Sequence, residues 1–177
     1  MTTLALSSLR NAIRDVPDFP QPGIIFKDIT PVLADPKLMK MAIEGMAEVV
    51  EDKRVDKIVG IDARGFIFGS MLAHQLGTGF VPARKKGKLP WKTRGLDYAL
   101  EYGTASLEIH EDAISPGEHI LLADDLLATG GTAGAALELI KQSGANIVAS
   151  VFFIELDFLK GRERVTSYAP VHSLLKY

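Results

Sequence analysis

The stretch that decides the fold of this chain is HILLADDLLATGGTAG, residues 119–134. Its apolar run, residues 120–123, is typical of a parallel strand buried on both faces. Two aspartates follow at the strand's carboxyl end, and residues 128–132 then make a glycine-rich turn that opens a helix. Such a turn directs backbone N–H groups, threonine hydroxyls and a helix N-terminus to one point, which suits a phosphate. Because the carboxylates need a separate task, such as ribose hydroxyls or a magnesium ion held through water, the stretch predicts a sugar-phosphate site.

The same residues have a plain structural alternative. Asp124 and Asp125 could be a solvated strand end, and the glycines an ordinary connection between strand and helix. We favour the phosphate site because the two acids directly precede the turn, and context distinguishes a functional motif from a chance pair of glycines.

The composition describes a globular chain with no general affinity for polyanions. Its 177 residues are enough for one domain, and 47% are apolar and 24% charged. The net charge of −2 predicts no nucleic-acid partner and no membrane partner. The absence of cysteine excludes disulfides and thiolate metal sites, and the four histidines are scattered. With no transmembrane-length apolar run and no signal peptide, the expected location is cytoplasmic.

Helical and strand patterns alternate along the chain. Helices are predicted over residues 4–14, 37–49, 66–76 and 133–143, and strands over residues 57–61, 79–83, 104–110, 118–123 and 147–154. This alternation implies an α/β fold with a mainly parallel sheet, whose ligands bind at the carboxyl ends of the strands. Prolines exclude a long helix from residues 17–36, where a packed strand or turn that caps a site is the better interpretation. Residues 155–177 show no clear pattern.

Residues 85–103 also show no clear element. A long segment of this kind is usually a functional lid or disordered. Six of the 20 lysines and arginines lie between positions 84 and 94, so the segment carries an anion-binding patch. A solvated charged loop is the alternative, and we favour a lid.

The sequence Asp-Asp-Leu-Leu-Ala-Thr-Gly-Gly-Thr, residues 124–132, resembles the phosphoribosyl-pyrophosphate (PRPP) signature of the type I phosphoribosyltransferases, in the form of the adenine-specific members. The resemblance extends from about residue 19 to about residue 161. It implies the type I phosphoribosyltransferase fold, a mainly parallel β-sheet flanked by helices with a small N-terminal hood and a long flexible lid loop. The single domain, residues 1–177, then divides into a helix and base-binding hood (1–35), an α/β core (36–160) with the lid loop (85–103), and a tail (161–177).

The resemblance implies that three segments bind PRPP. The turn would grip the 5′-phosphate and the two aspartates the ribose hydroxyls. In residues 60–66 the backbone and Arg64 would contact the leaving pyrophosphate, and the family's non-proline cis peptide maps to Asp62–Ala63. The basic loop would also contact pyrophosphate, with Arg84 reaching across from the partner in a homodimer. The implied PRPP-binding residues are Asp124, Asp125, Ala128, Thr129, Gly130, Gly131, Thr132, Asp62, Ala63, Arg84, Lys85, Lys88 and Tyr102.

A fourth segment, residues 19–29, resembles the family's base-binding hood, although it could simply be a packed turn. By this resemblance Phe26 stacks on one face of the purine and Leu127 on the other. The backbone groups of Ile25 and Lys27 would read the edge that carries the six-amino group. Arginine is common at the Lys27 position, but reading the base needs only the backbone there.

The resemblance implies a reaction of adenine with PRPP that gives AMP and pyrophosphate in purine salvage. The ribose would gain oxocarbenium character, as in glycosidases. The implied catalytic residues are Arg64 and the lid residue Glu101, which would help to remove the purine proton. Magnesium would be the cofactor, held mainly by substrate and water rather than by direct protein ligands. Trp91 departs from the small residue expected after Lys88-Leu89-Pro90, so the middle of the lid is the least transferable part.

Two alternatives to this function stay open. One is a phosphoribosyltransferase for guanine, hypoxanthine or xanthine, against which the sequence of the hood argues. The other is a non-enzymatic regulator that senses PRPP. Such a regulator is expected to carry a nucleic-acid-binding extension, for which the chain has no room.

Overall fold

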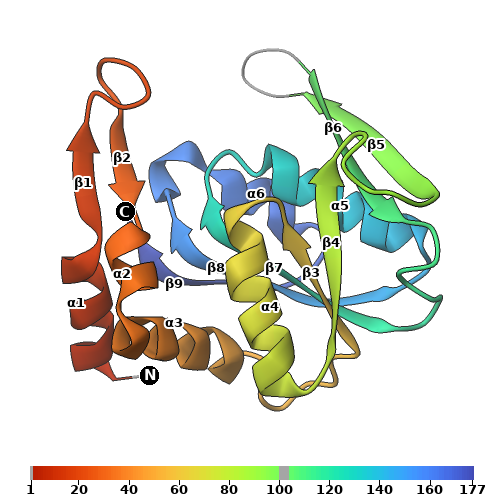
Figure 1. Ribbon diagram of the computed structural model, residues 1–177, viewed down its shortest axis with the longest axis horizontal. Helices are drawn as coiled ribbons and strands as arrows, with labels where there is room; N and C mark the ends of the chain where they lie inside the picture. Colours follow the sequence, from red (N-terminus) through yellow and green to blue (C-terminus); the bar gives the residue numbers. More distant parts are fainter. Residues whose placement is uncertain (1, 100–103) are drawn as a thin grey trace.

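The computed structural model describes residues 2–99 and 104–177, which form a seven-stranded sheet between two layers of helices (Figure 1). The strands, in their order across the sheet, are β5 (Thr93–Ala99), β6 (Thr104–His110), β4 (Gly79–Lys85), β3 (Lys57–Ile61), β7 (His119–Leu127), β8 (Asn146–Glu155) and β9 (Val171–Lys176). From β4 to β9 all neighbours are parallel, whereas β5 and β6 form an antiparallel edge. The predicted mainly parallel α/β fold is confirmed.

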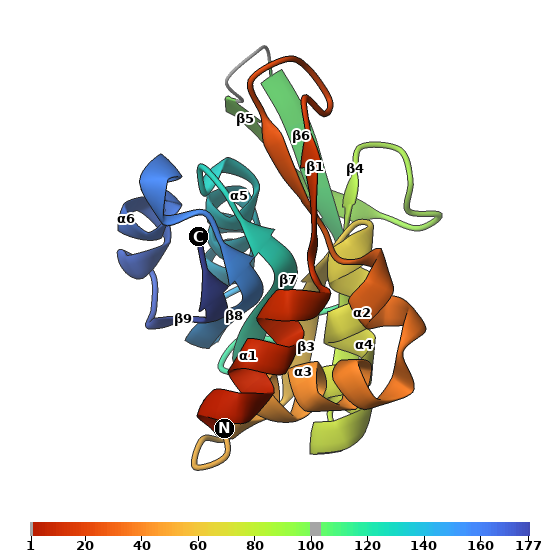
Figure 2. The ribbon, with the colours of Figure 1, turned by 90° about the vertical axis from the view of Figure 1, so that its left-hand side faces the viewer.

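The helices cover both faces of the sheet. One face packs against α1 (Thr3–Ala12), α2 (Thr30–Ala34), α3 (Pro36–Glu48) and α4 (Arg64–Leu76). The other packs against α5 (Gly131–Gln142) and α6 (Gly161–Thr166), which follows the short 3-10 turn η1 (Asp157–Leu159). Figure 2 shows the two helical layers on opposite sides of the sheet.

Side chains of the central strands alternate between two apolar cores. On β7, Leu121 and Ala123 pack with α3 and α4, whereas Ile120 and Leu122 pack with α5. All four are 0% exposed. A strand that is buried on both faces has no polar side to show, and this is why the apolar run predicted a central strand.

Two hairpins rise beyond the carboxyl ends of the parallel strands (Figure 1). One is formed by β1 (Arg14–Pro17) and β2 (Ile25–Asp28), which pair antiparallel. The other is formed by β5 and β6 at the sheet's edge. The strand ends, where α/β proteins bind ligands, therefore lie between two projecting arms.

The structure corrects the prediction that residues 85–103 contain no element. Thr93–Ala99 is a strand that pairs with β6 along its whole length. Gly95 and Asp97 are poor strand formers, but Leu96 and Tyr98 pack on an apolar core and the ladder to β6 supplies the pairing. Pairing with a distant segment therefore determines the structure here, against local propensity.

Other boundaries also differ from the predictions. The strand expected to end at residue 123 continues to Leu127, because Asp124, Leu126 and Leu127 pair with β8. Residues 155–177 contain η1, α6 and β9, which the sequence pattern did not indicate.

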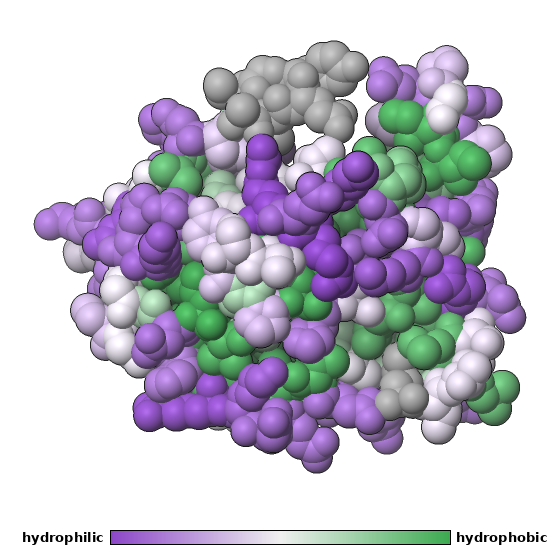
Figure 3. All heavy atoms as spheres, turned by 180° about the vertical axis from the view of Figure 1, so that it is seen from behind, coloured by the Kyte–Doolittle hydropathy of each residue, from purple (hydrophilic) through white to green (hydrophobic). Residues whose placement is uncertain are grey.

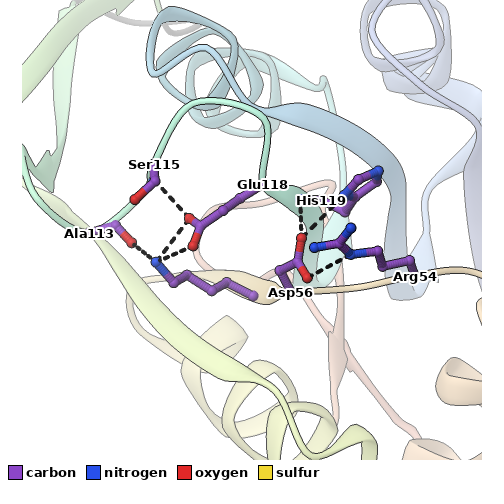
Figure 4. A network of polar contacts seen from close by, with 7 residues as sticks. Arg54, Asp56, Ala113, Ser115, Glu118 and His119 are labelled. Carbon is purple, nitrogen blue, oxygen red and sulfur yellow. Dashed lines mark hydrogen bonds and ion pairs between the residues drawn. The ribbon is translucent and has the colours of Figure 1, made fainter.

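A polar network ties together the amino ends of β3 and β7, opposite the strand ends that carry the motifs (Figure 4). Lys57 Nζ lies 2.9 Å from Glu118, which also accepts the N–H of Ser115 at 2.8 Å. Asp56 accepts the backbone N–H of His119 at 2.8 Å and Nε of Arg54 at 3.0 Å. These contacts fix the register of the two central strands at their starts.

The network predicts a specific acid sensitivity. The hydrogen bond from the backbone N–H of His119, with help from Arg54, lowers the pKa of Asp56 from 3.8 to about 2. Ionised Asp56 therefore adds stability above pH 3.8, and this contribution is lost as the pH falls towards 2. We expect Asp56→Asn to unfold at lower urea concentration than the wild type at pH 7, with the difference closing near pH 2. The exposed Asp52→Asn is the matched control, and a difference that does not change with pH would contradict the assignment.

Figure 3 shows the face opposite that of Figure 1, where hydrophilic side chains surround smaller apolar areas. Within residues 2–99 and 104–177, no helix combines the length and the apolarity that crossing a membrane requires.

Candidate active site

Two strand–turn–helix connections enclose a cavity of about 300 Å³ at the carboxyl ends of β3 and β7. These two strands are parallel neighbours, so their ends open at the same edge of the sheet. The cavity is lined by Ile61, Asp62, Ala63, Arg64, Asp124, Asp125, Leu126, Leu127, Ala128, Thr129, Gly130, Gly131, Thr132 and Ala133. The structure thus brings together the predicted phosphate turn and the predicted pyrophosphate loop.

The phosphate turn, residues 128–132, leads from β7 into α5. Gly130 has a φ of +76°, a left-handed conformation that glycine adopts readily, and α5 begins at the next residue. Thr129 and Thr132 are partly exposed and line the cavity. Backbone N–H groups, two hydroxyls and the positive end of a helix dipole are features that suit an anion, as the sequence predicts for this corner.

The two aspartates line the cavity and lie between its two loops in the sequence. Asp125 is 6% exposed, and its backbone N–H donates to Oδ1 of Asp124 at 2.9 Å. Burial and the like charge of Asp125 raise the pKa of Asp124. Gly65 allows this arrangement, since a Cβ there would lie 2.5 Å from Oδ1 of Asp124. Keeping Asp124 charged at this position therefore costs free energy.

Arg64 connects three of the predicted segments. Its Nε donates to Oδ2 of Asp125, and its guanidinium carbon lies 5.8 Å from the ring centroid of Phe26 in the hood. The side chain is 44% exposed, so part of the guanidinium stays accessible to a ligand. This one residue links the predicted pyrophosphate loop, the two aspartates and the hairpin predicted to bind the base.

The pyrophosphate loop has the predicted cis peptide between Asp62 and Ala63. The Asp62 N–H donates to the Ala83 carbonyl at 2.9 Å, and its carboxylate pairs with Nε of Arg84 at 2.9 Å. Arg84 also donates to the Lys88 carbonyl at 3.0 Å. Arg84 thus contacts its own chain here, and its reach into a partner subunit stays a prediction.

The hairpin of β1 and β2, the hood hairpin, carries Phe26 and Lys27. Phe26 faces Arg64 of the site, whereas the Lys27 side chain contacts Asp15 and Tyr177. Phe26 packs edge-on against Phe19 with ring centroids 5.2 Å apart. Nζ of Lys27 lies 2.6 Å from Asp15 and 4.3 Å from the ring centroid of Tyr177. The ammonium group of Lys27 is therefore engaged by Asp15 and Tyr177, and the role of the Lys27 backbone in reading a base stays a prediction.

Some predicted residues lie outside the cavity lining. These are Ile25, Phe26, Lys27, Arg84, Lys85 and Lys88. Two of them contact lining residues, since Phe26 lies against Arg64 and Arg84 pairs with Asp62. Lys85 ends β4, opposite Leu107 of β6. Glu101 and Tyr102 lie outside the described residues.

Sequence reasoning missed Gly65 and Tyr98. Nothing in the local pattern marked Gly65 as a spacer between two loops that are distant in sequence. Tyr98 stands on β5 and its hydroxyl lies 3.2 Å from Oγ1 of Thr132. The hairpin arm is therefore bonded to the phosphate turn.

Tyr98→Phe should test this bond. If Thr132 donates a hydrogen bond to a phosphate oxygen, its own oxygen can accept a hydrogen bond from the Tyr98 hydroxyl, so the tyrosine orients the donor. Loss of one such hydrogen bond is expected to raise the KM for the predicted substrate PRPP about threefold, with kcat nearly unchanged. The matched control is Tyr168→Phe, which removes a hydroxyl 3.1 Å from Glu138, a residue of α5 beyond the phosphate turn. An equal change in both variants would contradict a role at the phosphate turn.

These residues fit a magnesium ion whose ligands come mainly from substrate and water. In the described part of the chain, no group of three histidines, aspartates or glutamates is placed to hold a metal. Asp124 and Asp125 offer hard oxygen donors, the type that Mg²⁺ prefers together with substrate phosphates and water.

Comparisons with known proteins agree on one family. A family model described as the phosphoribosyl transferase domain matches residues 29–176. The adenine phosphoribosyltransferase of Nitrosococcus oceani is 52% identical over 172 residues, which cover 97% of this chain and 100% of that protein. The crystal structure of the enzyme from Rhodothermus marinus has a TM-score of 0.95 at 52% identity, covering 99% and 100% of the two chains. The structure of the Saccharomyces cerevisiae enzyme has a TM-score of 0.92 at 41% identity, covering 98% and 99%.

Proposed function

Because this chain belongs to the phosphoribosyltransferase family, among its adenine phosphoribosyltransferases, we propose that its strand-end cavity performs the transfer with the residues described above. The reaction converts adenine and PRPP to AMP and pyrophosphate. The observation that carries the assignment of residues is the single cavity shared by the phosphate turn and the loop at residues 61–64. Two anion-binding loops that face one cavity suit a ligand with phosphates at both ends of a sugar.

The phosphate turn would bind the 5′-phosphate of PRPP. Its amides and the hydroxyls of Thr129 and Thr132 supply donors, and the N-terminus of α5 favours the negative charge. Asp124 and Asp125 would accept hydrogen bonds from the ribose hydroxyls. These contacts hold the sugar in one orientation, which lowers the entropic cost of reaching the transition state.

Arg64 and the loop at residues 61–64 would stabilise the departing pyrophosphate. In this reaction the bond from the anomeric carbon to pyrophosphate breaks and a bond to the purine nitrogen forms. Negative charge grows on pyrophosphate while the ribose gains positive, oxocarbenium-like charge. A guanidinium group already fixed beside the cavity can stabilise that charge without reorganising during the step.

The hood would bind the purine. Phe26 offers an aromatic face above the site, and Leu127, 1% exposed, lines the cavity below. The structure of the Saccharomyces cerevisiae enzyme contains adenine and an imino-altritol bisphosphate, which supports a base site beside a two-phosphate site. Backbone groups of Ile25 and Lys27 would favour a six-amino purine, since a keto group would oppose an acceptor to an acceptor.

Phosphoribosyltransferases typically use PRPP complexed with magnesium, and we propose the same here. The ion would be held mainly by substrate and water, and Asp124 and Asp125 would bind it through that water. When bound, the ion would neutralise charge on the pyrophosphate.

Four further predictions complete the proposal. Glu101 would help to remove the purine proton and Tyr102 would contact PRPP, by family resemblance alone. A homodimer and a cytoplasmic location likewise stay predictions.

The proposed function is tested by measuring pyrophosphate release with PRPP and magnesium, in parallel reactions with adenine, hypoxanthine, guanine and xanthine. Strong preference for adenine is the expected result. Turnover of a keto purine instead would keep the sugar-phosphate site but overturn the assignment of the base. Tight PRPP binding without turnover of any base would favour the regulator.

A further inference from the structure

A loop outside the cavity lies against the back of the phosphate turn. This clamp loop, residues 155–162, runs from the end of β8 through η1 to the start of α6. Its first residue, Glu155, pairs in register with Leu127, which directly precedes the turn. The N–H of Leu156 also donates to the Leu127 carbonyl at 2.9 Å. The clamp loop and the phosphate turn therefore begin side by side, at the ends of the neighbouring strands β8 and β7.

At its other end the clamp loop packs backbone against backbone with the turn. A Cβ on Gly161 would lie 2.1 Å from the Ala128 carbonyl oxygen and 2.8 Å from the Gly130 nitrogen. Conversely, a Cβ on Gly130 would lie 2.6 Å from the Gly161 carbonyl oxygen. Backbone atoms in a packed interior cannot swing aside as a flexible side chain can. This contact therefore requires glycine on both sides.

An ion pair closes the clamp loop. Arg162 donates from Nε and NH2 to the two oxygens of Glu155, at 2.8 Å and 2.5 Å, and from NH1 to the Val171 carbonyl at 2.7 Å. Glu155 is 2% exposed. Although its burial acts in the opposite direction, the bonds from Arg162 hold the pKa of Glu155 below its ordinary value. Such a bidentate pair fixes both position and angle of the residue next to Gly161.

We propose that Gly161, fixed by the Arg162–Glu155 pair, is a positioning residue that holds the phosphate turn in the shape that binds the ribose 5′-phosphate. Gly161 acts through the backbone of Ala128 and Gly130, because turn amides bind a phosphate only when they converge on it. The identity of the ligand rests on the proposed function. The pyrophosphate loop follows β3 and is not among the groups that Gly161 would touch, which are Ala128, Thr129 and Gly130, so its ligand serves as an internal reference.

The test compares Gly161→Ala with Gly134→Ala. In the control, the added methyl group on α5 would lie 3.2 Å from Cδ of Arg164. This flexible side chain belongs to α6, the helix that also contains Gly161. Binding of ribose 5-phosphate and of pyrophosphate with magnesium is measured separately by calorimetry, together with the KM values for PRPP and adenine. We expect Gly161→Ala to weaken ribose 5-phosphate binding and to raise the KM for PRPP roughly tenfold or more. Pyrophosphate binding, the KM for adenine and all values for Gly134→Ala should stay near those of the wild type.

Arg162→Lys and Arg162→Gln provide the second measurement, which decides the question if Gly161→Ala does not fold. Lysine keeps the charge but loses the planar fork, so its ribose 5-phosphate affinity should lie between those of the wild type and the glutamine variant. Equal loss of both ligands, or a lower melting temperature with unchanged ribose 5-phosphate binding, would overturn the proposal. If the wild type shows no turnover with adenine, the proposed function fails, while the ribose 5-phosphate titrations still decide the role of Gly161.

Discussion

Arg64→Gln is expected to lower kcat/KM for PRPP by about a hundredfold to a thousandfold, the range for removing one preorganised donor from a developing negative charge. The structure supports this size because the guanidinium is held by Asp125 and lies 5.8 Å from the ring centroid of Phe26 before any ligand arrives. Steady-state kinetics at varied PRPP, with adenine saturating, measures the effect. The KM for adenine should change less, since the contact of Arg64 with the hood is with the face of the Phe26 ring.

Two controls separate catalysis from folding in this variant. Removing Arg64 leaves Asp125, which is 6% exposed, without its cation, at a stability cost of about 1–3 kcal/mol. The melting temperature is therefore recorded for each variant, and rates are measured well below it. Arg64→Lys keeps the charge without the planar fork and should recover part of the lost rate. A glutamine variant with normal turnover would remove Arg64 from the mechanism.

Asp124→Asn should make the protein more stable and much less active. Burial and the neighbouring Asp125 raise the pKa of Asp124 above 3.8. The favourable contribution of the neutral acid is therefore fully present below pH 3.8 and is lost as the pH rises through the raised value. Asparagine is neutral at every pH and can still accept the Asp125 N–H. We expect a melting temperature about 2–4 °C higher at pH 8, with kcat/KM about a hundredfold lower.

The pH dependence provides the control for Asp124→Asn. Since the wild-type side chain becomes neutral in acid, the two melting temperatures should converge as the pH falls. Calorimetric melting between pH 8 and pH 4 follows this convergence. A variant that is less stable than the wild type at pH 8 would show that the charge at Asp124 is compensated, and would contradict the assignment. Lower activity together with higher stability is the expected signature of a carboxylate kept for function.

Much of this architecture could be predicted from local patterns. The apolar run before Asp124 indicated a strand buried on both faces, and the structure has β7 at the centre of the sheet. The glycine-rich turn indicated an anion site, and the structure places it in the cavity. The prediction of the strand is confirmed, because burial is dictated by residues that are adjacent in the sequence. That the turn binds an anion stays a prediction.

The rest depends on contacts between distant segments. β5 contains Gly95 and Asp97, and only its ladder with β6 makes it a strand. The pairing of Arg64 with Asp125 joins residues 61 positions apart. The contact of Gly161 with Ala128 gives no local signal, because a glycine needed for close approach looks like any other glycine. Motif spacing could therefore suggest which residues line the site, but not the contacts between distant segments that hold those residues in place.

Because β7 continues to Leu127, this one strand sets the distance between the residues proposed to bind the ribose and the base. At about 3.3 Å per residue, roughly 7 Å of strand separates Asp125, proposed for the ribose, from Leu127, proposed for the base. Asp125 and Leu127 share one side of the strand, and a single inserted or deleted residue between them would move one of them to the opposite side. Such a change would disturb the pairing of the sheet. It would harm activity even more, because the residues proposed for the ribose and for the base would then point to opposite sides of the strand.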